Sequence, residues 1–86
     1  MECKFSKNAV SYIKSQDKIT RQRIKKAIDG LMEEPPRGDI KPLKGYKENV
    51  YRLRIGGYRI IYEFCHSNQE TYLHIKEIGS RGDIYK

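Results

Sequence analysis

Hydrophobic and polar side chains alternate along residues 50 to 64, VYRLRIGGYRIIYEF, on both sides of a Gly-Gly pair. Runs of Val, Ile, Leu, Tyr and Phe joined by two glycines are typical of a β-hairpin with a tight two-residue turn. With Gly56 and Gly57 in the turn, the register of the two strands follows directly. It predicts the facing pairs Ile55 with Tyr58, Arg54 with Arg59, Leu53 with Ile60, Arg52 with Ile61, and Tyr51 with Tyr62.

The two faces of this hairpin differ in chemistry, because successive side chains of a strand point to opposite sides. One face is expected to be core and carries Tyr51, Leu53, Ile55, Tyr58, Ile60, Tyr62 and Phe64. The other face carries Arg52, Arg54 and Arg59 and is expected to be left open. Directly opposed like charges destabilise a strand pair, so Arg54 facing Arg59 indicates a functional face that meets an anion or an acidic partner. A solvated basic face is the alternative interpretation.

The N-terminal half has the pattern of two helices. Residues 3 to 5 could form a short first strand, and Ser6 is suited to cap a helix from about Lys7 to Ser15. Asp17 is suited to cap a second helix, from about Lys18 to Glu34. The apolar residues of that helix recur at the spacing of one buried face, at Ile24, Ala27, Ile28 and Leu31.

Prolines shape the segment that follows. Pro35-Pro36 ends the second helix, because proline cannot continue its hydrogen bonds. Residues 37 to 49 are expected to form a loop with a short edge strand around residues 40 to 43, where Pro42 argues against a central position.

After the hairpin, the residues CHSNQE at positions 65 to 70 are expected to form a turn, and TYLHIKEIG at positions 71 to 79 a last strand. A bulge is expected near Glu77, because Ile78 is out of phase with Leu73 and Ile75. The order of elements predicts an α+β fold, with two N-terminal helices packed on one face of a mainly antiparallel sheet.

Length and composition indicate a single domain over residues 1 to 86, since a chain of this size has too little apolar material for a second core. No apolar run approaches the ~18 residues of a membrane span, and the N-terminus does not have the pattern of a signal peptide. We therefore expect a cytoplasmic protein that does not bind membranes.

The net charge of +7 is divided between residues 1 to 38, with +4, and residues 39 to 86, with +3, but one stretch of the second half is more basic than the rest. Residues 41 to 59 hold six basic residues against Glu48 alone: Lys41, Lys44, Lys47, Arg52, Arg54 and Arg59. Such a patch favours a polyanion, with nucleic acid as the leading candidate and an acidic protein as the other. The three lysines are placed to reach a ligand that lies on the hairpin. The basic face of the second helix is interpreted as solvated rather than as a contact to RNA.

Cysteine and histidine do not occur in a metal-binding spacing. Cys3 and Cys65 are expected to be free thiols. His66 is interpreted as a turn residue and His74 as an ordinary strand residue. We accordingly expect no metal site and no cofactor.

The basic second helix, the PLKG loop, the YRLRIGGYRIIYE hairpin and the closing IGSRGDIY together resemble the RelE/ParE superfamily of toxins, and more specifically the RelE-type messenger-RNA interferases. The resemblance implies a small twisted sheet with both helices on one face. It also implies the toxin of a toxin–antitoxin system: an endoribonuclease that needs the ribosome but no metal, and that cleaves messenger RNA in the A site through attack by the 2′-OH. A cognate acidic, RelB-like antitoxin would silence it, and it would not bind DNA by itself.

Carried over by position, the family's catalytic residues fall on Arg52, Arg54, Arg59, Arg81 and Tyr85. The chain departs from the family pattern at Val50 and Arg52, and at Ser80, where many relatives have histidine or lysine. These departures leave the general base open. Arginine titrates above pH ~12, so the arginines suit charge stabilisation better than proton abstraction.

Tyr85 is the preferred general base, because nearby guanidinium groups would favour its phenolate. It could instead stack on a nucleobase or fill the core, and Lys44 and Lys47 are the next candidates for the base. Two other functions of this fold stay open: a ParE-like inhibitor of DNA gyrase, and a relative that only binds an antitoxin.

Overall fold

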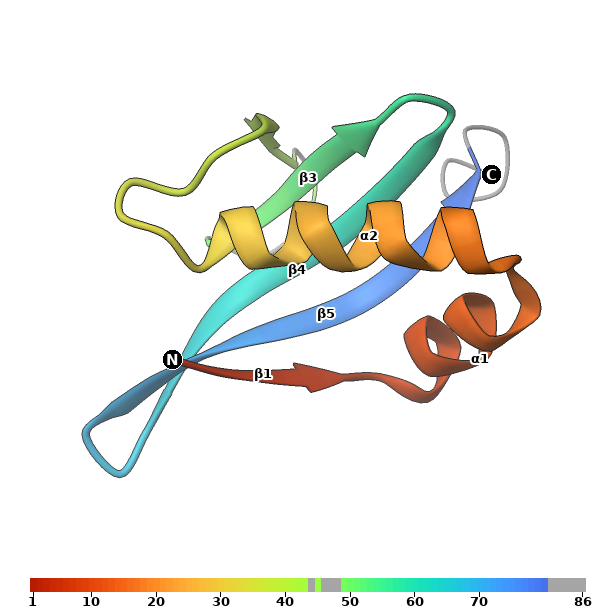
Figure 1. The fold of residues 1–86 in the computed structure, drawn as a ribbon. Helices are drawn as coiled ribbons and strands as arrows, with labels where there is room; N and C mark the ends of the chain where they lie inside the picture. The colour runs from red at the N-terminus through yellow and green to blue at the C-terminus, as the bar shows by residue number, and fades with distance from the viewer. Residues whose placement is uncertain (44, 46–48, 81–86) are drawn as a thin grey trace.

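Two helices lie on one side of a five-stranded sheet, and no helix formed by the described residues lies on the opposite side (Figure 1). The computed structural model describes residues 1–43, 45 and 49–80. The predicted α+β architecture is confirmed. In chain order the elements are β1 (Glu2–Phe5), α1 (Lys7–Ser15), α2 (Lys18–Leu31), β2 (Asp39–Pro42), β3 (Val50–Ile55), β4 (Tyr58–Ser67) and β5 (Glu70–Ser80).

The strand order in the sheet is β1-β5-β4-β3-β2. Strand β4, the second strand of the predicted hairpin, therefore lies in the middle of the sheet. Strand β1 runs parallel to β5, and the other neighbours are antiparallel. All five facing pairs predicted for the hairpin are present in the β3–β4 ladder, and Gly56 adopts the positive φ of 55° that such a turn requires. The edge strand β2 includes Pro42, as expected for a strand with one unpaired side.

Both predicted helix caps are confirmed. The Ser6 hydroxyl accepts a hydrogen bond from the Ala9 N–H at 3.1 Å, and the Asp17 carboxylate accepts one from the Thr20 N–H at 2.8 Å. The Ser6 hydroxyl also donates to the Lys76 carbonyl at 2.6 Å. This bond ties the start of α1 to the middle of β5.

The second helix is shorter than predicted. It ends at Leu31 instead of Glu34, with Met32 as its last capping residue. The Gly30 carbonyl accepts a hydrogen bond from the Arg37 N–H at 2.9 Å, so the chain after the helix turns back and competes for its last carbonyl groups. Glycine in the last turn also lowers the cost of ending the helix there.

The turn between β4 and β5 is also shorter than predicted. It contains only Asn68 and Gln69, both with positive φ, so the ladder continues through residues expected to be irregular. His66 consequently lies in β4 and faces Thr71, which corrects its interpretation as a turn residue. The bulge expected near Glu77 is confirmed, since Ile61 pairs with Glu77 but the next residue pairs with Ile75.

The core lies between the helices and the apolar face of the hairpin. Its buried side chains are Ala9, Ile24, Ile28, Leu31, Leu53, Ile60, Tyr62, Leu73, Ile75 and Ile78. The predicted assignment of the hairpin's apolar face is therefore confirmed. Neither of the described helices combines the length and the apolar character needed to cross a membrane.

Candidate functional site

The sheet side without helices carries a group of cations from three adjacent strands. Arg54 of β3 faces Arg59 of β4, while on the other side β2 places Asp39 opposite Arg54 and Lys41 opposite Arg52. We call the set Asp39, Lys41, Arg52, Arg54 and Arg59 the arginine face. The sequence predicted that these four cations gather, and the register of β2 brings Lys41 among them.

The arginine face is less open than predicted. Arg52 and Arg59 are only 6% and 4% exposed, whereas the Arg54 side chain is 47% exposed. Val50 and Ile61 alternate onto the same side of the hairpin and are buried as well. Arginine can bury its long aliphatic stem beside such apolar neighbours. In Arg52 and Arg59 the burial extends to the guanidinium group, because Nη2 of Arg52 and Nε of Arg59 are buried too.

Asp39 balances part of the charge. Its carboxylate oxygens lie 3.8 Å from Nη2 of Arg52 and 3.7 Å from Nε of Arg54. An acidic partner near Arg54 was expected, but Asp39 was not identified as that partner, because the register between β2 and β3 cannot be predicted from the residues of either strand. The nearest usable signal was the position of Asp39 just before the expected edge strand.

Arg59 has no carboxylate partner among the described residues. Its Nη1 donates a long hydrogen bond of 3.5 Å to the Tyr58 carbonyl. Within the described part of the chain, the buried Nε of Arg59 and Nη2 of Arg52 make no hydrogen bond. A buried guanidinium with unused donors is unfavourable in isolation, so these two atoms favour an anionic acceptor.

The remaining predicted site residues, Lys44, Lys47, Arg81 and Tyr85, lie outside the described residues. The part of the arginine face that is described offers fixed positive charge and one carboxylate, and no histidine. Such a surface can bind phosphate groups and stabilise negative charge that develops on them. The proton transfers of a cleavage reaction need a further group.

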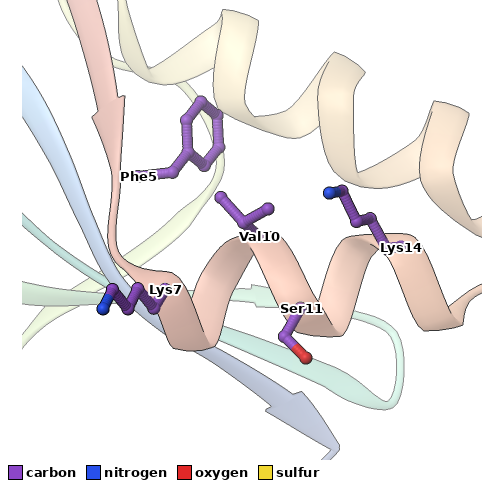
Figure 2. Close-up of a pocket in the computed structure, with 5 residues that line it drawn as sticks. All are labelled: Phe5, Lys7, Val10, Ser11 and Lys14. Carbon is purple, nitrogen blue, oxygen red and sulfur yellow. The ribbon is translucent and has the colours of Figure 1, made fainter.

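A shallow pocket lies between the end of β1 and α1 (Figure 2). Its apolar part consists of Phe5 and Val10, which are 40% and 38% exposed, and Lys7 and Lys14 lie at its edges. Among the described residues, those that line it include no histidine, carboxylate or thiol. An exposed apolar surface edged by lysines is instead suited to contact an acidic polypeptide.

Comparisons with known proteins relate the chain to toxins. Residues 4–85 match the family model described as the ParE toxin of type II toxin-antitoxin system, parDE. A search of curated protein sequences finds no match.

Solved structures share the fold over nearly their whole length. A chain of the RelB-RelE antitoxin-toxin complex from Methanococcus jannaschii is 30% identical, with a TM-score of 0.70 and coverage of 95% of this chain and 94% of that one. A chain of the archaeal RelE-RelB complex from Pyrococcus horikoshii is 29% identical, with a TM-score of 0.73 and coverage of 95% and 96%. The YoeB/ParE toxin from Agrobacterium tumefaciens is 18% identical and has a TM-score of 0.78, with coverage of 94% and 99%, which shows a common fold.

The family model spans almost the entire chain, and the related structures share its helices and sheet. The expected resemblance is thus confirmed: the chain belongs to the ParE toxin family of type II toxin–antitoxin systems, within the RelE/ParE superfamily.

Proposed function

We propose that this toxin is an endoribonuclease that cleaves messenger RNA in the ribosomal A site without a metal ion. The observation that carries the proposal is the arginine face, on which Arg52 and Arg59 hold buried donors without a hydrogen-bond acceptor among the described residues. A phosphate group supplies such acceptors. Arg54 and Lys41 are exposed beside them and can hold the flanking backbone of an RNA strand.

The proposed reaction is an attack of the 2′-OH on the adjacent phosphorus. A base removes the hydroxyl proton, the new O–P bond forms, the bond to the 5′ oxygen breaks, and that oxygen takes up a proton. The products are a 2′,3′-cyclic phosphate and a free 5′-OH. Arg52, Arg54, Arg59 and Arg81 stabilise the extra negative charge on the phosphorane.

Tyr85 is the proposed general base, and Lys41, Lys44 and Lys47 are the proposed RNA-binding residues. The acid and base groups on this chain are poorly matched to a reaction near neutral pH. Orientation of the message by the ribosome would therefore have to supply much of the rate.

We further propose a cognate acidic antitoxin of the RelB type as the partner that silences the toxin. The related archaeal structures are complexes of RelE with RelB, which supports such a partner for this chain. An acidic segment that covers Arg54 and Lys41 would block RNA. The lysine-edged pocket of Figure 2 offers a second contact.

The test is cleavage of a message on purified ribosomes, with 5′ ends mapped after single turnover. Arg54→Ala should abolish or strongly slow cleavage, whereas Arg37→Ala, which removes an exposed arginine paired with Glu33, should not. A message with a 2′-deoxy scissile nucleotide should resist cleavage. Full activity of Arg54→Ala, or cleavage of the deoxy message, would overturn the proposed site or mechanism respectively.

Gyrase inhibition is the second candidate, because the matching family model is one of ParE toxins. A supercoiling assay with purified gyrase separates the two. Inhibition of gyrase together with absence of RNA cleavage would replace the ribonuclease proposal. Absence of both activities, with retained antitoxin binding, would indicate a relative that only binds an antitoxin.

A further inference from the structure

Three side chains that can ligate a metal meet on the same side of the sheet as the arginine face, farther along β4 than Arg59. They are Glu63, Cys65 and His74, and their ligand atoms all lie within 4.8 Å of one another. We propose that they form a binding site for a zinc ion. The proposal goes beyond the toxin function and does not depend on it.

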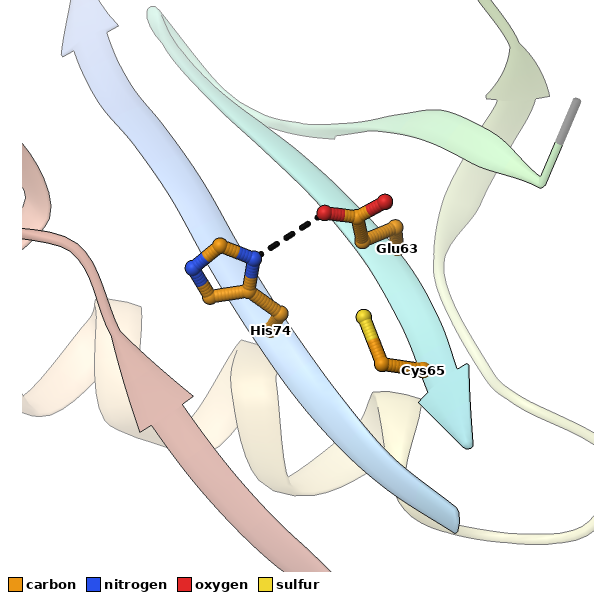
Figure 3. Close-up of side chains that lie close together, drawn as sticks. All are labelled: Glu63, Cys65 and His74. Atoms are coloured by element: carbon orange, nitrogen blue, oxygen red, sulfur yellow. Dashed lines mark hydrogen bonds and ion pairs between the residues drawn. The ribbon is translucent and has the colours of Figure 1, made fainter. Parts of the chain in front are cut away.

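The site is built on the β4–β5 ladder, in the stretch that follows the bulge at Ile61 and Tyr62. Glu63 and Cys65 are two residues apart on β4 and therefore point to the same side, and His74 faces Glu63 across the β4–β5 ladder. Figure 3 shows the three side chains on one side of the strand pair, with the Cys65 sulfur directed toward the other two. Because hydrogen-bonded strands carry all three, their backbone positions are set before any ion binds.

All three donors are of types that bind zinc in proteins. Zinc is bound by thiolate at about 2.3 Å, by imidazole nitrogen at about 2.0–2.1 Å and by carboxylate oxygen at about 2.0–2.2 Å, in a tetrahedron. Neighbouring donors of such a tetrahedron are about 3.3–3.7 Å apart. Nδ1 of His74 lies 3.0 Å from Oε2 of Glu63, so small side-chain rotations suffice. Magnesium and calcium prefer all-oxygen ligands and fit this set poorly.

Access and coordination number are also suitable. The His74 and Glu63 side chains are 31% and 20% exposed, and Cys65 is partly buried, so an ion can reach all three. Three protein ligands leave the fourth tetrahedral position for a water molecule or another ligand. On binding the ion, His74 and Glu63 would lose the hydrogen bond that now joins them and would each ligate the ion instead.

Two lysines lie near the site, and one of them, Lys76, would compete with the ion for Glu63. Nζ of Lys76 lies 3.2 Å from the same Glu63 oxygen that faces His74. Its side chain is 33% exposed and can turn into solvent when an ion replaces it. On β1, Lys4 faces His74, but its ammonium group lies 4.4 Å from the centroid of the Tyr72 ring and is held there. Zinc with one carboxylate and one thiolate makes a neutral group, which limits repulsion from both lysines.

The test is a titration of the full chain with Co²⁺, a spectroscopic probe for zinc sites, followed by displacement with Zn²⁺. One equivalent of Co²⁺ should give a thiolate-to-metal charge-transfer band, and Zn²⁺ should abolish it. Cys65→Ser should lose the band. Both Cys65→Ser and His74→Gln should weaken Zn²⁺ binding by at least ~10-fold in calorimetry.

Matched controls are present in the chain. Cys3→Ser removes the other thiol and His66→Ala removes the other histidine, and neither should change binding. Lys76→Met should tighten Zn²⁺ binding, because the competing ammonium group is gone, which a purely adventitious thiol site would not show. Circular dichroism checks that each variant is folded. Absence of saturable Zn²⁺ binding, or Zn²⁺ binding by Cys65→Ser and His74→Gln that is as tight as that of the parent protein, would overturn the proposal.

Discussion

Arg54 and Arg59 face each other across the β3–β4 ladder, but only Arg54 has a carboxylate beside it, with its Nε 3.7 Å from Oδ2 of Asp39. On its other side Arg59 faces Gly79 of β5, which has no side chain. Arg59 is therefore the buried cation with the least compensation among the described residues. The register of three strands creates this asymmetry, and it makes Arg59 the arginine most in need of an anion.

Replacement of Arg59 by methionine should separate stability from function. A buried charge without a partner is costly, so Arg59→Met should leave the free energy of unfolding unchanged or raise it by up to about 2 kcal/mol. RNA cleavage and toxicity should be lost, because the phosphate loses a donor. Urea denaturation and the ribosome assay measure the two effects. A marked loss of stability would show that Arg59 already has a favourable partner in the folded protein.

Removal of the Asp39 charge should strengthen binding of RNA. Asp39→Asn leaves Arg52 and Arg54 without their carboxylate, which increases the positive potential of the arginine face. Because the Asp39 side chain is 50% exposed, the change in unfolding free energy should stay within about 1 kcal/mol. Fluorescence anisotropy with a short RNA, over a series of salt concentrations, measures the affinity.

The control for Asp39→Asn is Glu33→Gln, which removes an exposed carboxylate that pairs with Arg37 instead. It should change RNA affinity less than Asp39→Asn does. If Asp39→Asn weakened binding, the role of Asp39 would be to hold the two arginines in position.

Truncation in the core should abolish activity through the fold. Leu53 is 1% exposed and packs in the core cluster, so Leu53→Ala should cost about 2–5 kcal/mol of unfolding free energy. Ile19 is 70% exposed, and Ile19→Ala should change stability by no more than about 0.5 kcal/mol. Thermal or urea unfolding compares the pair. Equal stability of the two variants would contradict the assignment of the hairpin's buried face.

Tyr62 should make the folded protein sensitive to alkali. Burial, and to a smaller extent its neighbour Tyr51, raises the pKa of Tyr62 from 10.0 to about 12. Folding thus favours the neutral phenol: the stabilisation is complete below pH 10.0 and is lost as the pH rises toward about 12.

The measurement is urea denaturation across that pH range, with Tyr62→Phe as the comparison. The parent protein should lose stability relative to Tyr62→Phe as the pH rises, since phenylalanine has no proton to lose. A parallel decline of both proteins would assign the alkaline loss to other groups.

The sequence by itself determined the features that depend on neighbouring residues. Ser6 and Asp17 cap helices through hydrogen bonds to the third residue after them, and Gly56-Gly57 sets the hairpin register residue by residue. The two-residue alternation of side chains along a strand assigned Leu53 to the core face of the hairpin and Arg54 to the charged face. These interactions span few residues, so local composition contains the information that specifies them.

Only the tertiary structure decided what lies beside each charge. Asp39 comes next to Arg54 through the pairing of β2 with β3, and His74 comes next to Glu63 through the two-residue turn at Asn68 and Gln69. The burial of Arg59 depends on several strands together. Side-chain neighbours across a sheet depend on the register between strands that lie apart in the chain. A shift of that register by one residue would move every side chain of the strand to the opposite face of the sheet.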